Sequence, residues 1–140
     1  MSYWFEVAIA TTNPTVIELI KDFKKEWNNF RIECDTKYLN EAAGENKERW
    51  QADIDRIKSG EDTYGLFNKE VIKDVHLFTT STNKISDLHY DLYNKIEEIA
   101  HDEEEGNTEI CIVGEEGETE RYAGNFNWIY LPNPAPQIVI

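Results

Sequence analysis

The sequence predicts an α+β protein with a mostly antiparallel sheet and two or three helices packed on one face. Three observations favour this class. Some segments carry apolar residues at alternate positions, which is typical of strands, and others carry them at three- and four-residue spacing, which is typical of helices. The two kinds follow one another as strand, helix, strand, helix, strand, helix, strand, strand, an order that suits a sheet covered by helices.

The first two elements have clear signals. A strand is expected over Tyr3–Ala10, because apolar and other residues alternate there, although both faces are rather apolar. A helix is expected after Asn13, a good N-cap, with Pro14 at its first position. We expect it to end at Asn28 and Asn29. Its apolar residues recur at four, three and four positions and line one face: Val16, Ile20, Phe23 and Trp27.

The middle of the chain predicts one strand, one helix and one loop. Residues Phe30–Asp35 alternate cleanly, which predicts a half-buried strand with one apolar side. Gly44 should separate residues 38–43 from a helix over residues 45–59, which Gly60 would stop. Residues 61–69 are expected to form a loop. The inward side chains of the predicted strand are Phe30, Ile32 and Cys34, and those of the helix are Trp50, Ile54 and Ile57.

The last part predicts a strand, a helix and a hairpin. The strand is expected over Lys73–Thr80, and the helix that follows should stop at Gly106. Two further strands, Thr108–Val113 and Glu120–Leu131, would be joined by the glycine-containing residues 114–117. The helix has an apolar stripe of Ile85, Leu88, Leu92, Ile96 and Ile99. One face of the final strand would carry Tyr122, Gly124, Phe126, Trp128 and Tyr130.

This order of elements also bears on topology and domains. Without the helix at 45–59, it approximates a split βαβ, ferredoxin-like order, which is our best prediction of topology. We expect one α+β domain over residues 1–131 and a proline-containing tail over 132–140. The closing residues 137–140 are apolar and uncharged. They are expected to pair with the edge of the sheet or to form a subunit contact.

The negative charge is concentrated near the C-terminus. The chain has a formal net charge of −14, and residues 96–140 hold eleven acidic residues against one base, Arg121. A protein of this charge is a poor ligand for nucleic acid or for an anionic membrane, because phosphate groups are bound by Lys and Arg. We therefore expect neither of those partners, but a basic protein.

The acidic residues beside the last predicted helix and in the predicted hairpin are the candidate binding site. They would form one negative surface if the helix end and the hairpin lie at the same end of the sheet. Most runs of charge only keep a surface solvated, and that alternative remains open here. The candidate partner-binding residues are Asp102, Glu103, Glu104, Glu105, Glu115, Glu116, Glu118 and Glu120.

The sequence has little that predicts catalysis. Phosphate-loop, nucleophile-elbow and dinucleotide motifs are missing, and the Cys and His spacing matches no zinc site. Residues 102–107 lack the ligand spacing of a calcium loop. Cys34 and Cys111 are expected to be buried free thiols in a reducing compartment. We therefore expect no cofactor, no metal and no enzyme activity.

These observations favour a small acidic, non-catalytic binding protein of the cytoplasm. It would dock on a basic groove of a nuclease or another nucleic-acid-handling protein and inhibit it by charge mimicry. A phage inhibitor of host defence and a toxin-neutralising immunity protein fit equally well. Two alternatives remain: an oligomeric structural or interaction protein assembled through its apolar C-terminal tail, and a small enzyme that uses His76 or His89.

Overall fold

The computed structural model describes residues 4–82, 86–102, 107–114, 119–124, 129–130 and 137–138. Three helices and a five-stranded antiparallel sheet lie in this part of the chain, which confirms the α+β class. The chain divides into two compact units. We name residues 1–21 with 67–140 the sheet unit, and residues 22–66 the helical unit.

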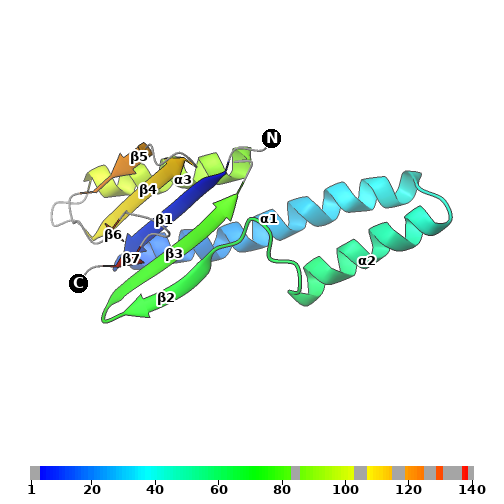
Figure 1. Ribbon diagram of the computed structural model, residues 1–140, viewed down its shortest axis with the longest axis horizontal. Coiled ribbons are helices and arrows are strands. Elements are labelled where there is room, and N and C mark those ends of the chain that lie inside the picture. The colour runs from blue at the N-terminus through cyan, green and yellow to red at the C-terminus, as the bar shows by residue number, and fades with distance from the viewer. Residues whose placement is uncertain are drawn as a thin grey trace. The chain divides into compact units, whose positions relative to one another are not determined.

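The sheet unit is built around a central strand. The strand order is β2-β3-β1-β4-β5 (Figure 1), and every neighbouring pair is antiparallel. Strand β1 pairs on both sides, so that Ile9 lies between Phe78 and Ile110. It is buried from Val7 to Thr11, and pairing on both sides satisfies its backbone hydrogen-bonding groups. The strands are β1 (Phe5–Thr11), β2 (Asn68–Ile72), β3 (Val75–Thr82), β4 (Thr108–Gly114) and β5 (Thr119–Ala123).

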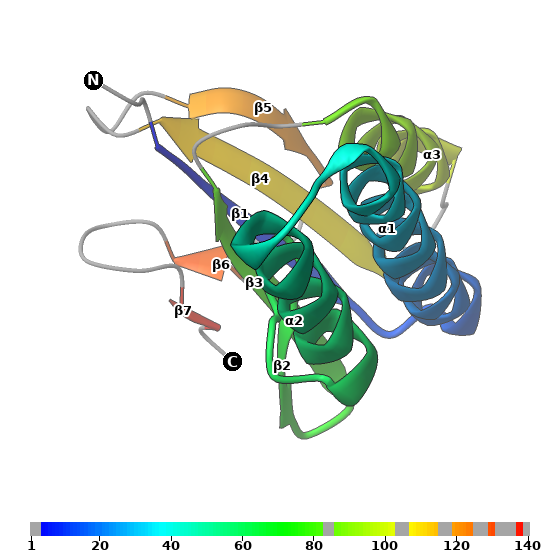
Figure 2. The same cartoon turned by 90° about the vertical axis from the view of Figure 1, so that its right-hand side faces the viewer.

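The helix α3 (Asp87–Asp102) covers one face of this sheet (Figure 2). Arg121 of β5 identifies the face, because its side chain bonds to Asn94 of α3. Register places Arg121 beside Ile112, and Ile112 beside Val7, so these residues share the helix-covered face. Of the predicted apolar stripe, Leu92 and Ile96 are buried, Leu88 and Ile99 are half-buried, and Ile85 lies outside the described residues. The inward side of α3 meets the sheet face, which explains why its inward residues are buried. Those residues are His89, Leu92, Tyr93, Ile96 and Ala100.

Two crossovers interleave in the sheet. Strands β1 and β2 run parallel with β3 between them, and β3 and β4 run parallel with β1 between them. Helix α3 lies in the second connection, while α1 (Pro14–Glu41) and α2 (Glu45–Ser59) lie in the first. This order agrees with split βαβ units. Strand β5 and helix α2 are additional to that pattern. The ferredoxin-like topology therefore stays a prediction.

The second face of the sheet lies opposite α3 (Figure 2). An apolar cluster of five buried residues lies on it: Ala8, Ala10, Val75, Leu77 and Cys111. A separate two-stranded sheet pairs β6 (Ile129–Tyr130) with β7 (Gln137–Ile138). The predicted continuous strand Glu120–Leu131 is therefore wrong, and the predicted pairing of residues 137–140 with the edge of the five-stranded sheet is not met by Gln137–Ile138. Strand β5 ends at Ala123, because Gly124 adopts a φ of +110°, outside the strand region.

The helical unit corrects one prediction. Residues Phe30–Asp35 are not a strand but the middle of α1, which continues to Glu41. The reason lies in the spacing. Phe30, Cys34 and Tyr38 extend the three- and four-residue stripe that starts at Val16, so the same residues fit a helix as well as an alternating strand. Asn28 and Asn29 do not end the helix.

The predicted helix over 45–59 is confirmed as α2. Its C-cap, Gly60, has a left-handed φ of +84° and donates its N–H to the carbonyl of Ile57. The predicted loop over 61–69 is too long, because Asn68 and Lys69 already belong to β2. This edge strand is largely exposed and pairs only with β3, so it lacks the apolar alternation that identifies a half-buried strand.

Candidate functional site: the outer face of α3

The start of α3 is fixed by a serine cap. Ser86 Oγ accepts the backbone N–H of His89 at 3.2 Å and lies 2.6 Å from Nδ1 of the same residue. This bond pairs a helix-end donor that would otherwise lack a partner. His89 is 1% exposed, so its ring is a structural part of the helix start.

The outward face of α3 carries four exposed carboxylates at spacings of four, seven and four residues: Asp87, Asp91, Glu98 and Asp102. We name them the α3 acidic row. These spacings return to one side of a helix, and a rise of 1.5 Å per residue makes the row ~22 Å long. Lys95 is the only Lys or Arg in α3. The row is therefore a net-negative ridge on the solvent side.

Arg121 does not neutralise this row. Its guanidinium donates to Asn94 Oδ1 at 2.7 Å and to a carboxylate oxygen of Glu97, and His101 Nε2 lies 3.8 Å from the other oxygen. Arg121 and Glu97 are each 27% exposed in their side chains. The only Arg or Lys of residues 96–140 is thus engaged between α3 and β5, at the edge of the row, where it offsets Glu97.

The predicted site residues are only partly described. Asp102 ends α3 and Glu120 lies in β5, and both are exposed. They belong to opposite ends of the sheet, since α3 leads into the start of β4 and β5 follows its end. Seven residues of β4 separate these ends by roughly 20 Å. The structure therefore does not bring Asp102 and Glu120 together. The remaining predicted residues lie outside the described part: Glu103, Glu104, Glu105, Glu115, Glu116 and Glu118.

Sequence reasoning missed three members of the row. Asp87, Asp91 and Glu98 are not among the predicted site residues, although the signal was present in the sequence. Their spacing repeats that of the apolar stripe, on the opposite side of the same helix. Contiguous acidic runs do not reveal such a pattern, because residues that share a helix face are three, four or seven positions apart.

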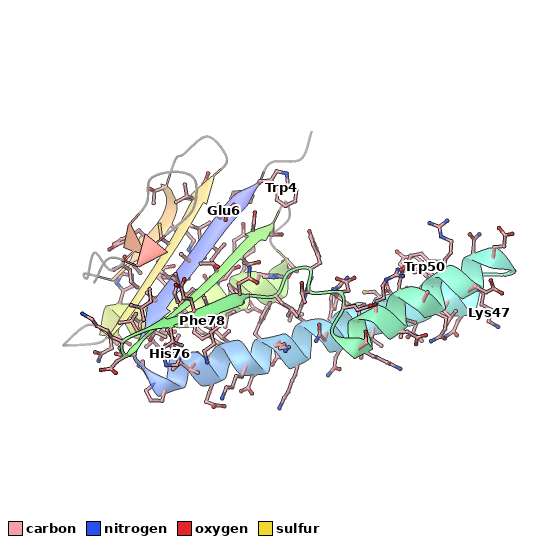
Figure 3. The ribbon with its side chains drawn as sticks, turned by 60° about the horizontal axis from the view of Figure 1, so that its bottom comes forward. Trp4, Glu6, Lys47, Trp50, His76 and Phe78 are labelled. Carbon is pink, nitrogen blue, oxygen red and sulfur yellow. The ribbon has the colours of Figure 1, made fainter. Side chains whose placement is uncertain are left out.

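The remaining histidines lie on β3 and α3. His76 lies on β3 between Thr11 and Val71, and its ring stacks on Phe78 with 6.3 Å between centroids (Figure 3). Its buried Nδ1 has no hydrogen-bond partner in the described part of the chain. His101 is exposed on α3. The same part contains no group of three or more His, Cys, Asp or Glu side chains placed to hold a metal ion.

The two cysteines are free and differ in burial. Cys111 is buried on the face of the sheet opposite α3, as predicted, whereas Cys34 is only half-buried on α1. Burial raises the pKa of the Cys111 thiol to about 11, and the nearby Glu109 carboxylate adds to the rise. A thiol with such a pKa is protonated at neutral pH, so Cys111 is a weak nucleophile.

A second polar cluster lies within the helical unit. Arg31 of α1 makes a two-pronged ion pair with Asp62, at 3.0 and 2.8 Å. These bonds lower the pKa of Asp62, whose carboxylate also accepts the backbone N–H of Tyr64. Burial raises the pKa of Asp35, and Asp53 is the next largest cause. Because Arg31 is engaged with Asp62, this cluster holds the loop after α2 on α1.

Comparison with known proteins adds no assignment. No protein family model matches this chain, and neither the curated protein sequences nor the solved structures that were searched give a match. In the described residues, none of the helices combines the length and apolar character needed to cross a bilayer.

Proposed function

We propose that this protein is a small acidic, non-catalytic binding protein of the cytoplasm that docks on a basic groove of a nuclease or another nucleic-acid-handling protein and blocks it. The observation that carries the proposal is the uneven charge of the two units. The sheet unit has seventeen acidic residues against six basic ones, whereas the helical unit has eleven against eight. The electric field of such a negatively charged unit attracts a basic partner and speeds its approach.

The α3 acidic row arranges part of this negative charge in a line along one helix. Its successive charges lie ~6, ~10 and ~6 Å apart along the helix axis. Screening in physiological salt acts over ~8 Å, so neighbouring members reinforce one another at that range. A nucleic-acid strand carries one charge per ~3.4 Å, so the row alone has a lower charge density than the ligand it would imitate.

The class of partner follows from complementarity, while its biological role stays open. A basic groove that normally binds phosphates would accept a line of carboxylates. Inhibition of a host-defence nuclease and neutralisation of a toxin nuclease use the same physical interaction. Both remain within the proposal.

The test compares two triple charge reversals. The first replaces Asp91, Glu98 and Asp102 by Lys and destroys the α3 acidic row. The matched control replaces three exposed acids of the helical unit and changes the net charge equally: Glu33→Lys, Glu41→Lys and Glu48→Lys. Each variant and the unaltered protein are titrated into cleavage assays with a panel of nucleases that have basic grooves, and circular dichroism confirms folding.

The proposal predicts that the unaltered protein and the control inhibit at least one nuclease, with weaker inhibition at high salt. The row variant should lose inhibition. Equal loss in both variants would mean that net charge alone matters, which contradicts docking through α3. Inhibition that survives in the row variant would remove α3 from the interface.

A further inference from the structure

Within the helical unit, one side of α1 meets α2. The half-buried residues of this side recur at four, three and four positions: Asn28, Ile32, Asp35 and Leu39. The Asp53 carboxylate of α2 interacts electrostatically with Asp35. Tyr38 of α1 stacks on Trp50 of α2, with 4.9 Å between the ring centroids. These contacts identify the side of α1 that is already occupied within the chain.

The opposite side of α1 carries a second stripe. It repeats the same spacing two residues earlier, which corresponds to about 200° around the helix. Its four residues are all exposed. We name this set the α1 outer stripe: Glu26, Phe30, Glu33 and Lys37. The stripe is therefore available to another molecule, because it points away from the side that packs on α2.

Phe30 gives the stripe an exposed ring that is held in place. Phe30 is 45% exposed, and its ring stacks on Trp27 with 5.7 Å between the centroids. Trp27 is buried, and its indole N–H donates to the Tyr64 carbonyl at 2.8 Å. An exposed phenyl ring is costly in water, and a ring that is already held loses little conformational entropy when a partner covers it. Phe30 therefore suits the centre of a protein interface.

The charges of the stripe complement those of a second copy. Glu26 lies four residues before Phe30, and Lys37 lies seven residues after it. If two α1 helices pack antiparallel around a two-fold axis midway between residues 26 and 37, each Glu26 lies beside Lys37 of the other copy. The same register leaves the two Phe30 side chains ~4.5 Å apart along the helix axes, so that they meet. A parallel arrangement would instead place Glu26 beside Glu26 and Lys37 beside Lys37.

Electrostatic repulsion between two copies is weakest at the helical unit. This unit has a net charge of −3, from eleven acidic and eight basic residues, whereas the sheet unit has −11, from seventeen and six. Two copies of a chain with a net charge of −14 therefore repel each other least when their helical units meet. Within the stripe, Glu33 lies four residues before Lys37 on the same helix, so Lys37 offsets its charge as well.

We propose that the α1 outer stripe is the interface of an antiparallel homodimer and that its occupant is a second copy of this chain. The two Phe30 rings lie at the centre of this interface, and two Glu26–Lys37 ion pairs flank them. A self-complementary patch closes after two copies. A single helix face makes a small interface, so the dimer is reversible and depends on protein concentration. The inference is independent of the proposed function, which concerns the outer surface of α3.

The first test reverses the charges one copy at a time. Analytical ultracentrifugation follows the dimer over a ~100-fold range of protein concentration up to ~1 mM. Glu26→Lys alone and Lys37→Glu alone each replace two attractive pairs by two repulsive ones, and each should raise the Kd of the dimer ~10-fold or more. An equimolar mixture of the two variants should recover the dimer, because opposite charges face each other in the mixed pair.

Matched controls separate position from net charge. Lys25→Glu and Glu48→Lys make the same changes of charge at exposed positions outside the stripe. The controls should leave the Kd close to that of the unaltered protein. Phe30→Ser should abolish the dimer while circular dichroism shows an intact fold. A monomer at every concentration would overturn the proposal, and so would a dimer that neither Phe30→Ser nor the charge reversals weaken.

Disulfide cross-linking tests the antiparallel arrangement. In a Cys34→Ser background, chains with Glu26→Cys are mixed with chains with Lys37→Cys and treated with a mild thiol oxidant. The antiparallel dimer should give the mixed disulfide dimer, because positions 26 and 37 lie side by side. Cross-linking of each variant mainly with itself would overturn the proposed arrangement in favour of a parallel one.

Discussion

Gly65 offers the sharpest test of packing in the helical unit. It adopts a φ of +78°, and a Cβ built on it would lie 2.6 Å from Nε1 of Trp27 and 2.8 Å from Cε2. The indole N–H donates to the carbonyl of Tyr64 at 2.8 Å, so the ring is fixed against the loop. Gly65→Ala must therefore move the indole and break this bond, besides placing alanine in a left-handed conformation.

The magnitude follows from three contributions. The left-handed backbone costs about 1–2 kcal/mol. Loss of the hydrogen bond costs about 1 kcal/mol, and overpacking against the ring costs about 1–3 kcal/mol. We expect Gly65→Ala to lower the free energy of unfolding by about 3–6 kcal/mol, which corresponds to about 10–20 °C in Tm. Urea and thermal unfolding followed by circular dichroism measure both values.

Gly60 is a matched control in the same unit. It has a similar φ of +84°, but a Cβ there would have nothing within 4 Å. Gly60→Ala should therefore lower stability only by the backbone contribution, about 1–2 kcal/mol. Replacing Trp27 by Phe should remove most of the excess cost of Gly65→Ala in a double-mutant cycle. Equal destabilisation by the two glycine substitutions would refute the reasoning.

Three further predictions concern single side chains. Gly124→Ala should cost about 4 kcal/mol in urea unfolding, because its Cβ would lie 2.6 Å from the Thr108 carbonyl oxygen, and backbone yields less than a side chain; a loss below 1 kcal/mol would contradict this packing. Tyr93→Phe should raise stability by about 1 kcal/mol, because the buried hydroxyl has no partner among the described residues; a marked loss would reveal a partner. Burial, and then Asp53, raise the pKa of Asp35 in the folded protein. Ionised Asp35 therefore lowers the stability of the fold, fully at a pH above its folded pKa and not at all below its unfolded pKa of ~3.9. Asp35→Asn should thus stabilise at pH 7 and have no effect at pH 3, and a gain at both pH values would disprove the electrostatic cause.

Local sequence patterns correctly predicted an element where the spacing of apolar residues fits only a helix or only a strand. The stripe of α2 and its Gly60 cap identify that helix, and the alternation over β1 identifies that strand. The prediction failed at Phe30–Asp35, where the residues satisfy both periods. The helix formed there because the stripe from Val16 to Trp27 was already helical, and extending a helix adds a hydrogen bond for each residue fixed.

For the candidate site too, local sequence and tertiary structure decided different features. The sequence alone determined that the C-terminal part of the chain is strongly acidic, whereas Asp87, Asp91 and Glu98 were recognised as neighbours of Asp102 only on the helix of the structure. Whether distant acids meet depends on which ends of the strands they follow, and only tertiary structure decides that.

By itself, then, the sequence determined the α+β class, the central helices and strands, and the sign of the surface charge, because these depend on composition and short-range periodicity. Tertiary structure alone decided two things: the end of β5 at Gly124 and the separation of Asp102 from Glu120. The physical reason is that strand order and close packing join residues far apart in the chain. Gly124 lies against Thr108 of another strand, for example, and no local pattern carries that information.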